Sequence, residues 1–310
     1  MIVMPLLRST ALALTAVLLL VACGDTGSDS SEGPDTSRRA PLTPSSVVPV
    51  SKLLVVVVEN HSLAEMRRGM PYTLRVARKY GYATRFHAIT HPSLPNYLAI
   101  AGGSTFGVRD DASPANHPVH GSSVFGQAVT RGKTARVYAE GMPRRCALES
   151  GGRRYAVKHN PWAYFVGERR ACHRDDVSLA TFRGDTAAGE LPNAGMVVPD
   201  LCHDAHDRDC SLGDADRWLR RLLRPVLAGP DFEAGRLAVV VTADEDDYSQ
   251  GNRVLTTVLH PSQRGHVVRV VLDHTSLTRL YDQVLGAPLL RGARSAPDLA
   301  AAFRLPIAPS

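Results

Sequence analysis

The sequence predicts an α/β fold built on a mainly parallel sheet. Two apolar runs, at residues 53–58 and 237–242, show no alternation of polar and apolar positions, which is typical of strands buried on both faces. Weaker strands are expected at 135–138, 195–198 and 253–259. Helix-like stretches lie among them, at 72–80, 95–101, 123–130, 214–227 and 276–285. This mixture predicts helices packed on both faces of one sheet.

The composition is that of an ordinary globular protein. Of the 310 residues, 44% are hydrophobic and 21% are charged, which allows a sizeable core. The formal net charge of +6 is scattered, apart from short pairs such as Arg144-Arg145 and Arg220-Arg221. A nucleic-acid-binding protein would concentrate basic and aromatic residues on one element, so we expect no nucleic-acid partner. The charge fits anionic substrates or an anionic membrane surface.

The N-terminus has the features of a bacterial export signal. Arg8 precedes an apolar run at 11–22 that is too short for a comfortable membrane-spanning helix, so residues 1–22 are predicted to be a signal peptide. The run ends in LVAC, which resembles the lipobox of bacterial lipoproteins and predicts lipidation of Cys23. The expected location is the outer face of the cell membrane. A secreted protein with an ordinary signal and a chance cysteine is the alternative.

Residues 23–50 are expected to be the lipidated cysteine and a flexible linker, because they are rich in Gly, Asp, Ser, Thr and Pro and lack apolar periodicity. Residues 51–310 show no internal repeat and no boundary that would divide them. We therefore expect a single domain over 51–310.

Four further cysteines are present in this domain: Cys146, Cys172, Cys202 and Cys210. An even number in an exported chain predicts two disulfides, which can be paired in three ways. Proximity along the chain favours Cys146 with Cys172 and Cys202 with Cys210. A zinc site is the alternative, although no two of them have CxxC spacing.

Acidic and amide side chains directly follow the two strongest strands. Glu59-Asn60 follows the first, and Asp244-Glu245 follows the second. Neighbouring parallel strands would bring both groups to the same edge of the sheet, where α/β folds bind their ligands. Carboxylates gathered there repel one another unless a cation lies between them. The pattern predicts a metal site, with solvated loop acids as the alternative.

Ser93 is expected at the beginning of a helix. Pro95 suits the first helical turn, where its missing N–H is not needed. Free backbone N–H groups and the positive end of the helix dipole favour an anion at such a place. Beside a cation, Ser93 could ionise and act as a nucleophile. The alternative is that Ser93 is an ordinary N-cap residue.

The densest group of ligand-type side chains is at 199–207 and includes His203, Asp204 and His206. A disulfide from Cys202 to Cys210 would hold this loop rigid. A polar surface loop is the alternative.

Together these segments resemble the phosphoesterase family of the alkaline-phosphatase superfamily, which includes bacterial phospholipases C and secreted acid phosphatases. The likeness is closest to small secreted acid phosphatases of the phosphatidylinositol-3-phosphatase type. The matching stretches are VVVVENHS at 55–62, THPSLPNYLAIAGGSTFG at 90–107, KHNPWAYF at 158–165, PDLCHDAHD at 199–207 and VVTADEDD at 240–247. The resemblance implies an alkaline-phosphatase-like, three-layer α/β/α sandwich.

The resemblance also implies a metal site. Glu59 and Asn60 match the family's first metal-binding pair, and Asp244 and Glu245 match the second. Other superfamily members hold two metals with Asp and His ligands, several of which are replaced here, so one divalent ion is expected. Hard oxygen ligands leave Ca²⁺, Mg²⁺ and Mn²⁺ open.

Several catalytic positions are implied by the same likeness. Ser93 matches the nucleophile, Asn96 matches a residue that holds a phosphate oxygen, and His91 in the same segment is expected to bind substrate. Asp204 and His206 match a DxH motif that faces the phosphate.

A proton donor for the leaving oxygen is expected to be His206 or His203. His274 matches a histidine near the same site, although a lone histidine is more often structural than catalytic.

The implied activity is hydrolysis of phosphate monoesters, including phosphoinositides, by an exported acid phosphatase through a phosphoserine intermediate. Mildly acidic pH would keep a histidine acid protonated. One alternative is a phospholipase C or phosphodiesterase on the same scaffold. Another is a lipid-anchored protein that binds phosphate or a cation without turnover.

Overall fold

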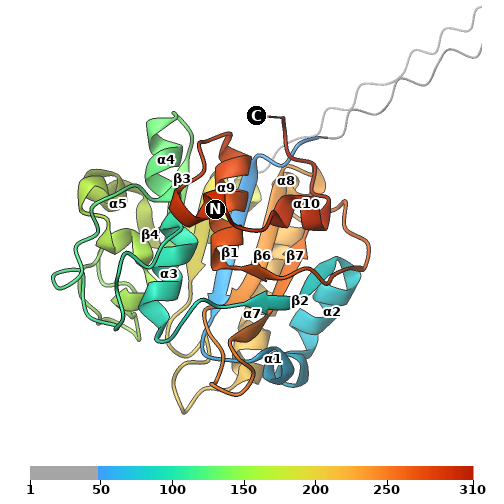
Figure 1. Cartoon of the computed structure of the whole chain (residues 1–310), viewed down its shortest axis with the longest axis horizontal. Helices are drawn as coiled ribbons and strands as arrows, with labels where there is room; N and C mark the ends of the chain where they lie inside the picture. Colours follow the sequence, from blue (N-terminus) through green and yellow to red (C-terminus); the bar gives the residue numbers. More distant parts are fainter. Residues whose placement is uncertain (1–47, 310) are drawn as a thin grey trace, which may run out of the picture. The chain divides into compact units, whose positions relative to one another are not determined.

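The computed structural model describes residues 48–309, which contain one nine-stranded sheet (Figure 1). The strand order is β4-β3-β5-β1-β6-β7-β2-β8, and β9 also pairs with β2. The strands are β1 (Lys52–Val58), β2 (Gly81–His87), β3 (Ala135–Ala139), β4 (Asp176–Ser178), β5 (Ala194–Val198), β6 (Leu237–Ala243), β7 (Arg253–Leu259), β8 (His266–Val268) and β9 (Leu272–Asp273). The predicted signal peptide, Cys23 and most of the linker lie outside the described residues.

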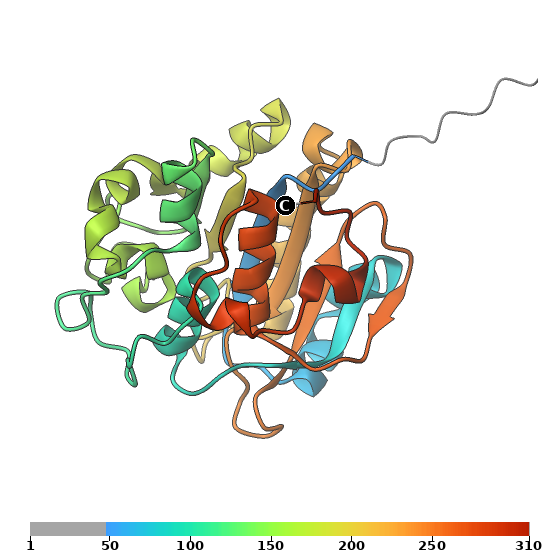
Figure 2. The ribbon, with the colours of Figure 1, turned by 45° about the horizontal axis from the view of Figure 1, so that its top comes forward.

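Helices cover both faces of the sheet. They are α1 (Leu63–Gly69), α2 (Pro71–Lys79), α3 (Ser93–Gly102), α4 (Val124–Thr130), α5 (Arg169–Asp175), α6 (Phe182–Ala188), α7 (Leu212–Leu227), α8 (Pro230–Glu233), α9 (His274–Leu285) and α10 (Leu299–Phe303). Helices α3 and α4 pack with α9, whereas α1, α2 and α6 pack with α7. Figures 1 and 2 show α9 in front of the strands. The predicted three-layer α/β/α fold is confirmed. In the described part of the chain, no helix has the length and apolar character needed to cross a membrane.

The direction of the strands gathers several loops at one edge of the sheet. Strand β1 lies between β5 and β6 and runs parallel to both, with Val58 opposite Ala243 at the end of the β1–β6 pair. Strand β7 is antiparallel to β6 and to β2, so β2 points the same way as β1. The loops that follow β1, β2, β5 and β6 therefore leave from the same edge.

The central strands explain the apolar runs in the sequence. Strand β6 is buried along its whole length and β1 from its second residue onward, because each has a neighbouring strand on both sides and helices above and below. Strand β2 was not predicted. Its burial alternates, since it lies near the end of the sheet and has polar residues such as Thr84 and Arg85 within it.

Helix α7 has a buried apolar face and an exposed basic face. Ser211 begins the helix with a capping box that involves Asp214. The buried side includes Trp218, Leu219, Leu222, Leu223 and Val226. The exposed side carries Arg217, Arg220, Arg221 and Arg224. The apolar face packs toward the other helices of its layer, which forces the arginines outward.

The structure contains two disulfides, Cys146–Cys172 and Cys202–Cys210, the pairing that proximity along the chain predicts. The alternative zinc site is ruled out for these cysteines, because their sulfur atoms are bonded to each other. The second disulfide closes the loop between β5 and α7, which carries Asp204 and His206.

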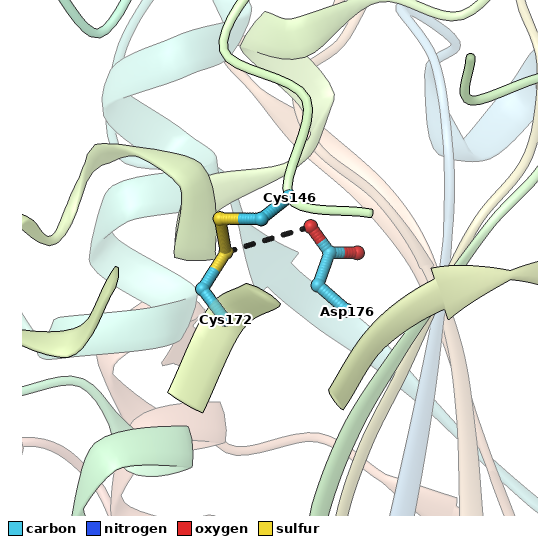
Figure 3. Close-up of side chains that lie close together, drawn as sticks. All are labelled: Cys146, Cys172 and Asp176. Carbon is cyan, nitrogen blue, oxygen red and sulfur yellow. Dashed lines mark hydrogen bonds between the residues drawn. A yellow bond between two sulfur atoms is a disulfide. The ribbon is translucent and has the colours of Figure 1, made fainter. Parts of the chain in front are cut away.

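A buried carboxyl group lies against the first disulfide (Figure 3). Asp176 Oδ2 is 3.7 Å from Cys172 Sγ and accepts a hydrogen bond of 2.8 Å from Asn160 Nδ2. Burial raises the pKa of Asp176 to about 8, and the Asn160 hydrogen bond offsets only part of that rise. The folded chain therefore keeps a proton on Asp176 at pH values where the unfolded chain releases it.

The proton held by Asp176 predicts how the free energy of unfolding changes with pH. The contribution of Asp176 to the free energy of unfolding is full below pH 4 and is lost as pH rises toward 8, because the folded state binds the extra proton in that window. Asp176→Asn supplies a neutral side chain, so its stability relative to the parent should increase between pH 4.5 and pH 7.5 in urea unfolding. Glu190→Gln removes an exposed carboxylate and serves as the control. An equal stability difference at both pH values would contradict a protonated Asp176.

Candidate active site

The residues that follow four strands meet at one edge of the sheet. Asp244 N–H donates a hydrogen bond to the carbonyl of Val58 at 3.1 Å, and Glu59 N–H donates to the carbonyl of Asp204 at 2.9 Å. Asn60 N–H donates to Asp244 Oδ1 at 3.1 Å. The loops after β1, β5 and β6 are thus joined directly, which confirms the expectation that the two acidic groups share an edge.

Ser93 is the first residue of α3 and is buried. The N-cap residue is Pro92, whose side chain makes no capping hydrogen bond. Ser93 Oγ instead donates a hydrogen bond of 3.0 Å to Glu59 Oε2. The N-cap alternative is therefore wrong. The hydroxyl faces the acidic group at the helix N-terminus, and its nucleophilic role stays a prediction.

Glu59 is the centre of this group. It is fully buried and also accepts a short hydrogen bond from the hydroxyl of Tyr97. Its Oε2 lies 3.2 Å from His159 Nε2. Burial acts to raise the pKa of Glu59, but His159, Lys158 and Tyr97 outweigh it and lower the pKa to about 2. Glu59 is therefore an anion in the folded protein.

His159 supplies a buried positive charge beside Glu59. It ends the short 3₁₀ helix η1 (Val157–His159), and its ring stacks on Tyr97 with centroids 5.1 Å apart. His159 Nδ1 lies 3.2 Å from Asp204 Oδ2. Burial opposes the charged imidazole, but Glu59 and Asp204 raise the pKa of His159 to about 9. The two carboxylates thus hold a protonated imidazole between them.

Two side-chain oxygens of the predicted metal ligands have no hydrogen-bond partner among the described residues. Asn60 Oδ1 and Asp244 Oδ2 are buried, and neither has a hydrogen-bond partner among the described residues. Burial, Glu59 and Glu245 raise the pKa of Asp244 well above its usual range, and burial with Glu59 raises that of Glu245 to about 8. Orphaned oxygens beside carboxylates that repel one another suit a hard divalent cation. The residues present fit the predicted metal site.

A second set of ligand atoms overlaps this site. Glu59, His159 and Asp204 each offer one atom, and the three atoms lie within 4.8 Å of one another. Glu59 therefore belongs both to the predicted metal ligands and to the histidine cluster.

Asn96 connects the loop before Ser93 to the acidic group. Its Oδ1 accepts hydrogen bonds from the N–H groups of Ile89 and Thr90. Its Nδ2 donates to the carbonyl of Thr90 at 2.7 Å and to Glu245 Oε2 at 3.3 Å. The amide is already engaged, so binding a phosphate oxygen would compete with these contacts.

Asp204 and His206 lie close together in the same loop segment, and both are near His159. Asp204 is buried, and its Oδ1 accepts a hydrogen bond from the N–H of His206 at 2.9 Å. In this structure Asp204 therefore positions His159 and His206. The contact of Asp204 with phosphate stays a prediction. His206 is partly exposed, and its Nε2 lies 3.3 Å from Lys158 Nζ.

Lys158 brings a second cation to this edge. Its Nζ lies 2.9 Å from Asp111 Oδ2, and Asp111 Oδ1 accepts a hydrogen bond from the N–H of Leu94 in the first turn of α3. Burial acts to lower the pKa of Lys158, but Glu59 and Asp111 raise it above its usual value. Lys158 is thus a charged group beside both His206 and the helix that begins at Ser93.

His91 and His274 support the acidic loop after β6. His91 Nδ1 lies 3.1 Å from Glu245 Oε2, and its ring stacks on the exposed Tyr248 with centroids 3.9 Å apart. His274 is buried, and its Nε2 lies 2.5 Å from the carbonyl oxygen of Asp244. Burial lowers the pKa of His274 to about 4, so it is a neutral donor that positions Asp244.

His203 is separated from the group around Ser93. Its Nδ1 lies 2.9 Å from Glu140 Oε2, and its ring stacks on Trp218. His203, Glu140 and Asp200 line a different cavity of about 460 Å³. Of the two histidines proposed as the acid, His206 is the one that contacts the site's other charged groups.

The sequence reasoning missed three residues of the site. Tyr97, Lys158 and His159 all contact its central groups, yet none was given a role. A signal was available, because Lys158 and His159 open the matching stretch KHNPWAYF and Tyr97 lies in the stretch that contains Ser93.

The sequence of this chain is similar to those of known phosphatases. The model of the Phosphoesterase family matches residues 62–288. The chain is 28% identical over 263 residues to the phosphatidylinositol-3-phosphatase of Mycobacterium tuberculosis, covering 83% of this chain and 84% of that protein. It is 32% identical over 190 residues to the phosphate-repressible acid phosphatase of Penicillium chrysogenum, covering 59% of this chain and 45% of that protein. The chain thus spans less than half of the fungal relative.

The fold is also found among solved structures. A protein of the alkaline phosphatase superfamily from Vibrio parahaemolyticus aligns with a TM-score of 0.58 at 8% identity, covering 82% of this chain and 70% of that one. The chain therefore has an alkaline-phosphatase-like fold. The chain belongs to the phosphoesterase family, whose model matches well over half of it.

The oxygen-rich site predicts stabilisation by a divalent cation. Saturating Ca²⁺, Mg²⁺ or Mn²⁺ should raise the Tm of the full chain by about 5 °C or more, because the ion binds the folded state. Asp244→Asn removes one carboxylate and should lose most of this rise, while its Tm without cation stays equal or increases because repulsion is relieved. Asp247→Asn, an exposed acid of the same loop, is the control. A cation shift that survives Asp244→Asn would contradict the site.

Proposed function

We propose that this chain is an exported, metal-dependent acid phosphatase that hydrolyses phosphate monoesters through a phosphoserine on Ser93. The enzyme class, phosphoric monoester hydrolase, is confirmed by the family and by the names of the relatives. The observation that carries the finer proposal is the buried hydrogen bond from Ser93 Oγ to Glu59, at the beginning of α3.

The N-terminus of α3 supplies a place for the phosphate. In its first turn the Leu94 N–H donates to Asp111 and Pro95 has no N–H, so the Ser93 N–H and the positive end of the helix dipole are what favour an anion there. Lys158 and the protonated His159 add positive charge beside the same turn. Both cations are already paired with carboxylates of the site, so the preference for a monoester is supported by the names of the relatives, a phosphatidylinositol-3-phosphatase and an acid phosphatase.

The reaction follows from the positions of the chain's own groups. The hydrogen bond to Glu59 orients Ser93 Oγ, which loses its proton to solvent and attacks phosphorus, and the bond from phosphorus to the ester oxygen breaks as the new bond forms. His206, when protonated, gives its proton to the leaving alcohol. Water then attacks the phosphoserine, returns a proton to His206 and releases phosphate as Ser93 is protonated again. A bound divalent cation would lower the pKa of the Ser93 hydroxyl and neutralise phosphate oxygens.

The expected ligands of that cation are Glu59, Asn60, Asp244 and Glu245. Their oxygens fit Ca²⁺, Mg²⁺ or Mn²⁺, and an ion bound here would give a partner to the orphaned oxygens of Asn60 and Asp244. His274, Asn96 and His91 hold the backbone or side chains of these ligands and do not replace them.

Export and the membrane location belong to the same proposal. Signal-like residues 1–22 and the lipobox ending at Cys23 support export and lipidation. Two disulfides fit an oxidising compartment outside the cytoplasm. The relative named a phosphatidylinositol-3-phosphatase supports a phosphoinositide headgroup as one substrate.

Hydrolysis of p-nitrophenyl phosphate tests the proposal. The full chain should hydrolyse it between pH 5 and 9 and lose activity with EDTA, and one added cation should restore it. Ser93→Ala should lower kcat at least about a thousand-fold, because it removes the nucleophile. Ser295→Ala, a serine far from the site in the sequence, is the control. The cation-induced rise in Tm should persist in Ser93→Ala if only the nucleophile is lost.

Other outcomes would change the assignment. Faster hydrolysis of bis-p-nitrophenyl phosphate than of the monoester would favour a phosphodiesterase or phospholipase C. No turnover of either ester, with cation binding retained, would favour a protein that binds phosphate or a cation without catalysis.

A further inference from the structure

Helix α7 presents a cluster of arginines to solvent. Arg217, Arg220, Arg221 and Arg224 together line a surface hollow of about 500 Å³. Arg75 of the neighbouring helix α2 lies over the ring of Tyr72, with its guanidinium carbon 5.8 Å from the ring centroid. Arg220 and Arg224 act on the same tyrosine, opposing the rise in the pKa of Tyr72 that burial causes. The arginines of both helices therefore form one basic face.

The positive charge of this face is largely unbalanced. Arg217 pairs with Asp214, whereas Arg220, Arg221 and Arg224 have no carboxylate partner among residues 48–309. Asp216 of the same helix points inward, where it accepts hydrogen bonds from the N–H groups at the beginning of α2. Solvent screens the repulsion between these exposed arginines, and their unpaired guanidinium groups are available to bind an anion.

An apolar hollow adjoins the arginines. It measures about 470 Å³ and lies between Arg183 and Arg221. The remaining residues of its lining are Leu179, Phe182, Trp218, Leu222 and Pro225. A surface for inorganic phosphate or nucleic acid would need the guanidinium groups but not this apolar lining. A phospholipid has both an anionic headgroup and an apolar part.

We propose that this face docks on an anionic phospholipid bilayer. The guanidinium groups of α7 bind headgroup phosphates, for which their planar donors are well shaped, and the adjoining hollow takes apolar parts of the lipid. This inference goes beyond the proposed function, because the face is separate from Ser93 and needs no catalysis.

The position of the face relates it to the active site. Helix α1 begins just after Glu59 and Asn60, and α7 begins just after the loop that carries Asp204 and His206. Both helices therefore start at the catalytic edge and belong to the layer that carries the arginines. Docking through this layer keeps the catalytic edge close to the lipid surface.

Co-sedimentation with vesicles tests the proposal in the full chain. Vesicles of phosphatidylcholine alone are compared with vesicles containing 30% phosphatidylglycerol, so that any binding by the N-terminal apolar segment is common to both. The parent should prefer the anionic vesicles, and 0.5 M salt should abolish the preference. The triple variant Arg220→Glu, Arg221→Glu, Arg224→Glu should bind anionic vesicles at least a hundred-fold more weakly.

A matched variant controls for net charge. Arg144→Glu, Arg170→Glu and Arg269→Glu change the total charge equally on exposed arginines of other elements, and this variant should keep the preference. The corresponding triple glutamine variant of α7 should also lose the preference for anionic vesicles. Because it introduces no acidic side chain, this variant shows that the loss does not come from misfolding caused by the new glutamates. Hydrolysis of soluble p-nitrophenyl phosphate should be the same in parent and variants.

Three results would overturn docking on lipid. They are equal binding of the parent to neutral and anionic vesicles, equal losses in the α7 and control variants, or tighter binding to duplex DNA than to anionic vesicles. A parent without phosphatase activity that still shows the α7-dependent preference would refute the proposed function and leave the lipid surface standing.

Discussion

The buried carboxylate of Glu59 is the interaction on which the rest of this site depends. It receives hydrogen bonds from Ser93 and Tyr97 of α3 and lies 3.2 Å from His159. These contacts connect the end of the central strand β1 to two segments far away in the sequence. An anion at this depth is tolerable only with positive charge beside it, and so the position of His159 and Lys158 follows from the burial of Glu59.

The same charge balance explains why the edge is polar although the strands beneath it are apolar. Asp204 holds one nitrogen of His159 while Glu59 holds the other, which leaves Asp244 and Glu245 without an equivalent protein cation. Burial raises the pKa values of both groups, and the negative charge of Glu59 adds to the rise. A divalent cation would balance the charge of Asp244 and Glu245. Its expected ligands are held in place by neutral groups such as His274 and Asn96.

The sequence predicts some parts of this arrangement better than others. The strands β1 and β6 are evident because strands buried on both faces must be continuously apolar, and the acids that follow them could be placed at one edge from strand direction alone. Strand β2 was missed because its burial alternates, although it delivers Ser93 to the site. Lys158 and His159 were missed because they lie in an irregular segment between β3 and β4, where no periodicity shows which side chains turn inward.

The arginines of α7 form one basic face, although the basic residues of the whole chain look scattered in the sequence. In the sequence the basic residues look scattered, yet positions 217, 220, 221 and 224 have the spacing of one helical face. Because Trp218, Leu219 and Leu222 must pack inward, the four arginines can only point to solvent. The helix also continues from the loop that bears Asp204 and His206. A single amphipathic helix thus connects the basic surface to the edge of the sheet that carries the candidate active site.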